Sequence, residues 1–206
     1  MERRGFLIGL PFAAAGLSGV LQAAETKPTE AEAKAIEAIQ KAGGSVRRIA
    51  QGDDRLEVDF HLGGSSLTND SLKPLAQLKN VLDLHLGGTE IDDGALVIVG
   101  GLTALTRLHL EKTAVTDKAL GQLKELANLE YLNLYGTAVT DAGLKQLAGL
   151  TKLKNLYLWQ TKATESGVKA LRAALPGLTV DTGWDLAQTQ EINKDKPPAD
   201  PDKKAP

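Results

Sequence analysis

The three histidines of the chain recur at one phase of a 24-residue spacing, as His61, His85 and His109. Asp59 and Asp83 precede the first two of them by two residues. Imidazole nitrogens and carboxylate oxygens are donor atoms that bind zinc and other divalent transition metals. These five side chains are therefore candidate metal ligands, and their chemistry depends on whether the fold brings them to one point.

Catalytic chemistry has little support in the sequence. The absence of cysteine excludes disulfides, thiolate nucleophiles, iron–sulfur clusters and a lipoprotein anchor. Ser65 and Ser66 lie near His61, but the repeat pattern accounts for both. The segment GGTEIDDG has the glycines of a phosphate loop without its lysine. We therefore expect a non-enzymatic protein without a cofactor, and the net charge of −2 argues against a nucleic-acid partner.

Apolar residues follow the same 24-residue period in six columns between positions 60 and 174. The first two columns lie two residues apart, as in a strand, and the last three are spaced by three residues, as in a short helix. A Thr-Asp pair between them suits a helix start, because it can accept hydrogen bonds from free N–H groups. Each unit is thus predicted to be strand, turn and helix, and only stacked units bury their apolar faces.

The segment LEYLNLYGTAVTDAGLKQLAGL (129–150) resembles a leucine-rich repeat, in particular the Thr-Asp-x-Gly-Leu variety common in bacterial exported proteins. The resemblance covers about 56–180 in five units and implies an α/β solenoid. Such a solenoid is a short right-handed arc with a parallel concave sheet and convex helices. Two departures stand out. Threonine replaces the usual turn asparagine, which should serve the turn less completely, and Leu175-Pro176-Gly177 suggests an insertion that breaks the register of the last unit.

The ends of the chain differ from the repeats. Residues 1–24 have Arg3 and Arg4 before an apolar stretch too short for a membrane span, which is typical of an export signal. RRGFL resembles the twin-arginine export motif, although Glu2 stands where Ser or Thr is usual, and the general export pathway is the alternative. Cleavage after Ala24 would leave a periplasmic or secreted protein without a stable membrane anchor.

Three further segments complete the predicted organisation. Residues 25–55 form an N-terminal cap, with a helix within 29–44 and two strands within 45–60 around a Gly-Asp-Asp turn. Residues 56–184 form the solenoid and its C-terminal cap, where Trp184 would shield the last unit. Residues 185–206 are rich in proline and charge, and should be disordered.

Residues between the two apolar strand columns must face away from the core, onto the concave sheet. This places the histidines in a ladder on neighbouring strands about 4.8 Å apart. The exposed columns gather all three histidines, all three tyrosines and one tryptophan. The candidate partner-binding residues are Tyr131, Asn133, Tyr135, Asn155, Tyr157, Trp159, Arg107, Glu111 and His109.

Three functions are compatible with this surface. We favour a monomeric interaction module that recognises an unknown protein or peptide partner on its concave sheet, because aromatic rings on a rigid sheet suit binding. The first rival is a metal-binding exported protein. The outer histidine strands would lie about 9.6 Å apart, so we favour solvated histidines paired with the acids. The second rival is a structural or assembly scaffold that uses its helices.

Overall fold

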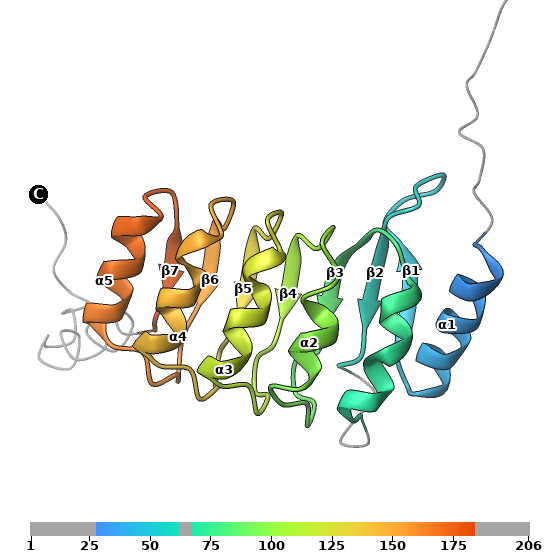
Figure 1. The fold of residues 1–206 in the computed structure, drawn as a ribbon, viewed down its shortest axis with the longest axis horizontal. Helices are drawn as coiled ribbons and strands as arrows, with labels where there is room; N and C mark the ends of the chain where they lie inside the picture. Colours follow the sequence, from blue (N-terminus) through green and yellow to red (C-terminus); the bar gives the residue numbers. More distant parts are fainter. Residues whose placement is uncertain (1–27, 62–66, 184–206) are drawn as a thin grey trace, which may run out of the picture.

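The computed structural model describes residues 28–61 and 67–183. The predicted export signal, Trp184, the predicted disordered tail and the serines near His61 lie outside these residues. Among the described residues, no helix has the length and apolar character required to cross a membrane. The described part is a single row of strands with helical segments packed along one side (Figure 1).

Within the described residues, seven strands form one sheet in chain order. They are β1 (Ser45–Arg48), β2 (Leu56–Asp59), β3 (Val81–His85), β4 (Arg107–His109), β5 (Tyr131–Asn133), β6 (Asn155–Tyr157) and β7 (Thr179–Asp181). β1 pairs with β2 antiparallel, and every later pair is parallel. From β3 to β7 each residue pairs with the residue 24 positions further on, so the sequence period is the strand register.

The helical segments are of mixed type. α1 (Glu30–Lys41) precedes β1. The segments between the later strands are η2 (Asn69–Gln77), α2 (Ala95–Val99), α3 (Asp117–Leu120), η3 (Gly121–Glu125), α4 (Asp141–Gln146), η4 (Leu147–Gly149) and α5 (Glu165–Ala174). η2 is a 3₁₀-helix that contains Pro74, a residue without the backbone N–H that an α-helix interior requires. The predicted helix of each unit is therefore present, in either α or 3₁₀ form.

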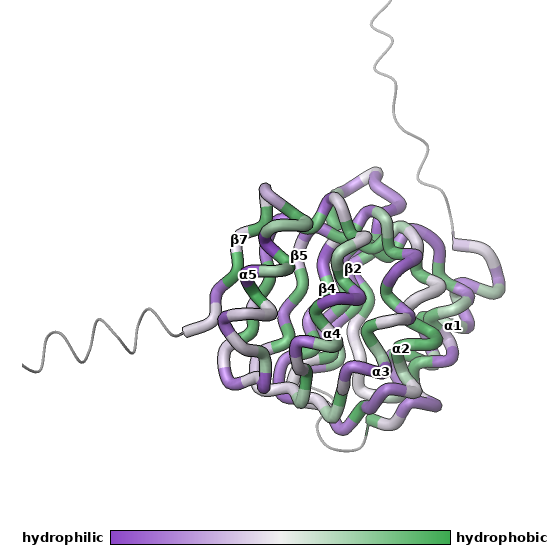
Figure 2. Tube along the Cα trace, turned by 60° about the vertical axis from the view of Figure 1, so that its left-hand side comes forward, coloured by the Kyte–Doolittle hydropathy of each residue, from purple (hydrophilic) through white to green (hydrophobic). Residues whose placement is uncertain are grey.

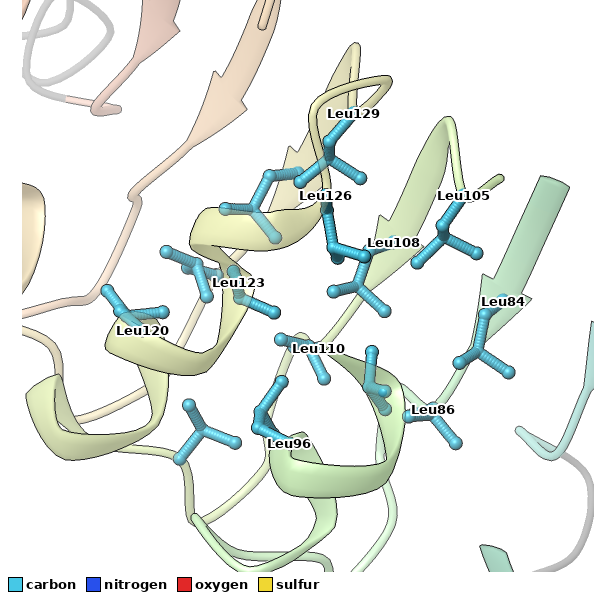
Figure 3. Close-up of a cluster of buried hydrophobic side chains, with 14 of the residues drawn as sticks. Leu84, Leu86, Leu96, Leu105, Leu108, Leu110, Leu120, Leu123, Leu126 and Leu129 are labelled. Carbon is cyan, nitrogen blue, oxygen red and sulfur yellow. The ribbon is translucent and has the colours of Figure 1, made fainter. Parts of the chain in front are cut away.

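The core lies between the sheet and the helical side, where the apolar columns meet. Leucines of the strands and of the helical turns point toward one another in Figure 3, and the labelled residues are all buried. Along the trace, hydrophobic positions occur in both the strands and the helices (Figure 2). The pattern confirms the prediction of an α/β leucine-rich-repeat solenoid.

The N-terminal cap has the predicted helix and hairpin. Thr29 and Glu32 form a reciprocal capping box at the start of α1, which fixes where the helix begins. Ile39 is fully buried on the face that packs toward η2 and β1. The cap therefore closes the apolar end of the first repeat.

The repeats are joined by a polar ladder on their helical side. Asp117 accepts hydrogen bonds from both the backbone N–H and the hydroxyl of Thr140, at 2.7 and 2.6 Å. Asp93 binds Thr116 in the same way, and Asp141 binds Thr164. The sequence predicts a role for these aspartates at the start of their own helices, but each carboxylate also binds the threonine of the next unit. The Thr-Asp pair is thus a link between units as well as a helix cap.

The turn threonines form a second ladder, which is buried at Thr89, Thr113 and Thr137 and half-buried at Thr161. The hydroxyl of Thr137 donates to the carbonyl of Leu134 at 2.7 Å, and Thr89, Thr113 and Thr161 make the equivalent bond in their own units. A single hydroxyl satisfies one turn carbonyl per unit.

The end of the last repeat corrects one prediction. The segment Leu175-Pro176-Gly177 does not break the strand register, because Val180 pairs with Leu156 at the usual 24-residue offset. The change is local: Leu175 is buried in place of the exposed Ala174. α5 is longer than the other helices of the repeats, and this extra length turns Leu175 rather than Ala174 toward the core.

Candidate functional site

The sheet face opposite the helices, here called the open sheet face, carries two parallel rows of side chains. The strand register places Asp59, His85, His109, Asn133, Tyr157 and Asp181 in one row. It places Glu57, Asp83, Arg107, Tyr131, Asn155 and Thr179 in the other. Val58, Leu84, Leu108, Leu132 and Leu156 alternate with these rows and are buried, which is why the rows face out.

The histidine ladder is shorter than predicted. Asp59, not His61, pairs with His85, because β2 and β3 pair at an offset of 25 residues at Leu56 and of 26 residues after the irregularity between Leu56 and Glu57, instead of 24. His61 lies beyond the end of β2. Its ring Nδ1 is 2.6 Å from Asp59 Oδ1, and its backbone N–H donates to the same oxygen. The prediction that all three histidines stand side by side is therefore wrong for His61.

The other two histidines stack on each other. The ring centroids of His85 and His109 are 3.8 Å apart with an angle of 13° between the planes. The side chain of His109 is only 10% exposed, so the expectation of a solvated histidine is wrong at this position. Its other face meets the ring of Tyr131 at 4.7 Å. His109 is buried because aromatic side chains cover it on both sides.

Asp83 is the carboxylate at the centre of this cluster. Its Oδ1 lies 3.1 Å from His85 Nε2 and 3.7 Å from His109 Nε2. Its Oδ2 lies 3.0 Å from Arg107 Nε. Burial alone would raise the pKa of Asp83, but the two histidines and Arg107 lower it below its ordinary value. The carboxylate is therefore ionised at neutral pH.

The two stacked imidazoles have opposite electrostatic environments. Asp83 raises the pKa of His85 above its ordinary value, in spite of partial burial. Burial lowers the pKa of His109 to about 4, and the neighbouring His85 adds to this effect. At neutral pH the Nε2 or Nδ1 of His109 therefore offers a lone pair.

Glu111, two residues beyond the end of β4, completes the polar cluster. Its Oε2 is 3.9 Å from His109 Nδ1. A Cβ atom at Gly87 would collide with the Glu111 carboxylate, so glycine at this position gives the side chain room to lie across the neighbouring unit. Glu111 approaches His109 from the side of the ring opposite to Nε2.

The predicted aromatic residues form two ring pairs. Tyr131 and Tyr157 have centroids 5.2 Å apart, and Tyr135 and Trp159 have centroids 5.3 Å apart. Trp159 is 51% exposed, whereas the three tyrosines are half-buried. These rings meet in pairs across β5 and β6, and Tyr131 also continues the stack from His109. Sequence reasoning found the rings but missed this continuous contact between histidine and tyrosine.

Cations and amides flank the ring pairs. The guanidinium of Arg107 lies 4.4 Å from the Tyr131 ring centroid, and Lys112 Nζ lies 5.4 Å from that of Tyr135. Asn133 Oδ1 accepts the backbone N–H of Tyr135 at 3.0 Å, so its amide group is oriented with the NH₂ available. Asn155 is half-buried between Tyr131 and Thr179 in its row.

Among known proteins, the chain is similar to solved structures. No protein-family model matches the chain, and no curated protein matches it. An internalin (InlF) from Listeria monocytogenes is 26% identical over 53% of this chain and 30% of its own length, with a TM-score of 0.45. A leucine-rich-repeat protein from Leptospira interrogans is 21% identical over 52% of this chain and 27% of its own length, with a TM-score of 0.42.

A third solved structure spans more of its own chain. Internalin C2 from Listeria monocytogenes is 21% identical over 75% of this chain and 87% of its own length, with a TM-score of 0.42. The chain thus spans less than a third of the first two proteins and most of the third. All three are leucine-rich-repeat proteins by name or by fold, but the fold assignment here rests on the strand register and the buried columns.

Proposed function

We propose that the protein is a non-catalytic interaction module that binds a protein or peptide partner on the open sheet face. The observation that carries this proposal is the pair of ring contacts at β5 and β6, where Trp159 is half-exposed and stacked on Tyr135. Rings held against one another keep few rotamers, so binding loses little side-chain entropy. Exposed aromatic area on a rigid surface is typical of the centre of an interface.

Charge and hydrogen-bonding groups suit an extended or helical peptide with an acidic or carbonyl-rich side. Arg107 lies over the Tyr131 ring, and Lys112 lies over the Tyr135 ring. Asn133 stands between these two tyrosines in the sequence, and its side-chain oxygen accepts the backbone N–H of Tyr135. Each of these groups can donate hydrogen bonds. The partner would therefore place an apolar group on the rings and acceptors around it. Export to the periplasm or the outside, with a partner there, belongs to the same proposal.

The test begins with a random peptide library displayed on phage and selected on the full chain. Affinities of the selected peptides are then measured by calorimetry for the wild type, Trp159→Ala and Tyr135→Ala. We expect each substitution to weaken binding by roughly 1–3 kcal/mol, the range of central aromatic contacts. The melting temperature should change little, because Trp159 is half-exposed.

Val97→Ala is the matched control, because Val97 is an apolar residue on the helical side that is 65% exposed. It should leave peptide affinity unchanged. Equal affinity for wild type and the Trp159→Ala/Tyr135→Ala double variant would contradict the proposal. A loss confined to Val97→Ala would favour the rival scaffold role of the helical side.

A further inference from the structure

The cluster at β3 and β4 contains an unusual group of polar atoms. Asp83 Oδ1, His109 Nε2 and Glu111 Oε2 are buried and make no well-aligned hydrogen bond among the described residues, although His85 Nε2 lies 3.1 Å from Asp83 Oδ1. Buried polar atoms in folded proteins are normally hydrogen-bonded, and each exception needs an explanation. All three exceptions found in the described part of the chain belong to this one cluster. Two of them, Asp83 Oδ1 and His109 Nε2, lie 3.7 Å apart, which points to a shared partner that is missing.

We propose that Asp83, His85 and His109 bind one divalent transition-metal ion, with Zn²⁺ as the representative ion. Each of the three residues offers one donor atom, and these atoms lie within 4.8 Å of one another. We assign the donors as Asp83 Oδ1, His85 Nε2 and His109 Nε2, because this oxygen is the one nearest to both Nε2 atoms. Two of these three atoms are among the buried atoms without a hydrogen-bond partner. Nitrogen and oxygen donors of this kind suit zinc and its neighbours in the transition series.

The spacing of the donor atoms fits one small ion. Zinc ligands lie roughly 2.0–2.2 Å from the ion, so tetrahedral donors are about 3.4 Å apart. The carboxylate oxygen is 3.1 Å from one imidazole nitrogen and 3.7 Å from the other, values on either side of that spacing. Three protein donors leave a coordination position for water or for a group of a partner.

The stacked rings need one adjustment. Parallel rings direct their Nε2 lone pairs along nearly parallel lines, so one ring must rotate to aim both at a common ion. His85 can supply this rotation, because its side chain is 27% exposed, while His109 is held between two rings. Rotation about χ2 of histidine is soft, so the change costs little.

The charged side chains around the donor atoms keep them available to a cation. Glu111 lies beside His109 Nδ1, where a carboxylate favours the tautomer that leaves Nε2 free for the ion. Arg107 contacts Asp83 Oδ2 and so leaves Oδ1 for the ion. Two carboxylates and one guanidinium give the cluster a net charge of −1 when both imidazoles are neutral, which attracts a cation. His61 and Asp59 contact each other and lie outside the group of three donors.

The experiment titrates the tag-free full chain with ZnCl₂ at neutral pH by calorimetry, with MgCl₂ as the comparison ion. We expect one Zn²⁺ per chain and no Mg²⁺ binding, because magnesium prefers oxygen donors. His85→Asn and His109→Asn should abolish the zinc isotherm. Glu111→Gln should weaken it by roughly 10- to 100-fold, as expected for a group that orients a ligand.

His61→Asn is the matched control, since it removes the third histidine from the same face and should leave zinc affinity unchanged. Proton NMR gives an independent readout, because the chain has only three histidines. Zinc should shift the imidazole signals of His85 and His109 and leave those of His61 in place. Absence of zinc binding to the wild type, or an equal loss in His61→Asn and His85→Asn, would overturn the proposal. Circular dichroism of each metal-free variant establishes that a lost isotherm is not a lost fold, and peptide binding is measured separately.

Discussion

Leu134→Ala tests whether the inward columns form one continuous core. Leu134 is fully buried, and the equivalent residues of the units before and after it, Leu110 and Leu158, are buried as well. Its backbone N–H donates to the carbonyl of Tyr157 at 2.9 Å, which holds the chain in place and limits collapse around the shortened side chain. Removing a buried leucine side chain costs about 2–5 kcal/mol, and limited collapse favours the upper half of that range.

The assay is thermal unfolding of the full chain followed by circular dichroism, with urea unfolding as a second measurement. For a domain of this size, each kcal/mol lowers the melting temperature by roughly 2–4 °C, so the upper half of the range gives a fall of roughly 7–20 °C. An unchanged urea slope would show that the same surface is exposed on unfolding.

The matched control is Val97→Ala, which shortens a side chain that is 65% exposed on α2. We expect the free energy of unfolding to change by about 0.5 kcal/mol or less, as for other surface substitutions. If Leu134→Ala melts at the wild-type temperature, Leu134 does not lie in the core. If Val97→Ala and Leu134→Ala are equally destabilised, the assignment of inward and outward columns is wrong.

Three further predictions follow from the ladders and the N-terminus. Thr137→Val should lower the free energy of unfolding by about 0.5–1.5 kcal/mol in urea unfolding, because the bond to the Leu134 carbonyl is lost while the shape is kept. Hydrogen bonds from the Thr164 side chain and backbone lower the pKa of Asp141. Its carboxylate therefore stabilises the fold above the ordinary carboxyl pKa and loses this effect as the pH falls through the folded value. Asp141→Asn should melt lower than wild type at neutral pH, and the difference should shrink at acid pH. Mass spectrometry of the native protein should find an N-terminus near Glu25, and an intact Met1 would contradict export with cleavage.

The repeat architecture could be predicted because it depends on local periods. Alternation by two and spacing by three determine which side chains turn inward, and the buried residues follow the predicted columns as far as Leu150. Among the column residues that the structure describes, only Ala174 departs, because α5 is longer than the other helices of the repeats. The pairing of β2 with β3 could not be predicted, since its offset of 25 and then 26 residues, with an irregularity between Leu56 and Glu57, leaves His61 out of the row.

Contacts between units could not be predicted from single units. Asp117 and Thr140 are 23 residues apart, and only the stacking of two turns shows that the carboxylate reaches the next unit. The burial of His109 likewise depends on neighbours from both adjacent strands, His85 and Tyr131. A residue's column indicates its direction, whereas its exposure depends on the side chains beside it.

Arg107 lies between the two proposed sites. Its Nε contacts Asp83 at 3.0 Å, and its guanidinium lies over Tyr131 at 4.4 Å from the ring centroid. An ion on Asp83 would share that carboxylate's charge with Arg107 and so change how firmly the guanidinium is held over the ring. Any effect of Zn²⁺ on peptide affinity must be matched by an equal effect of the peptide on Zn²⁺ affinity. Measuring both affinities for wild type and for Arg107→Ala therefore shows whether the open sheet face acts as one surface, and equal affinities with and without the second ligand would mean two independent sites.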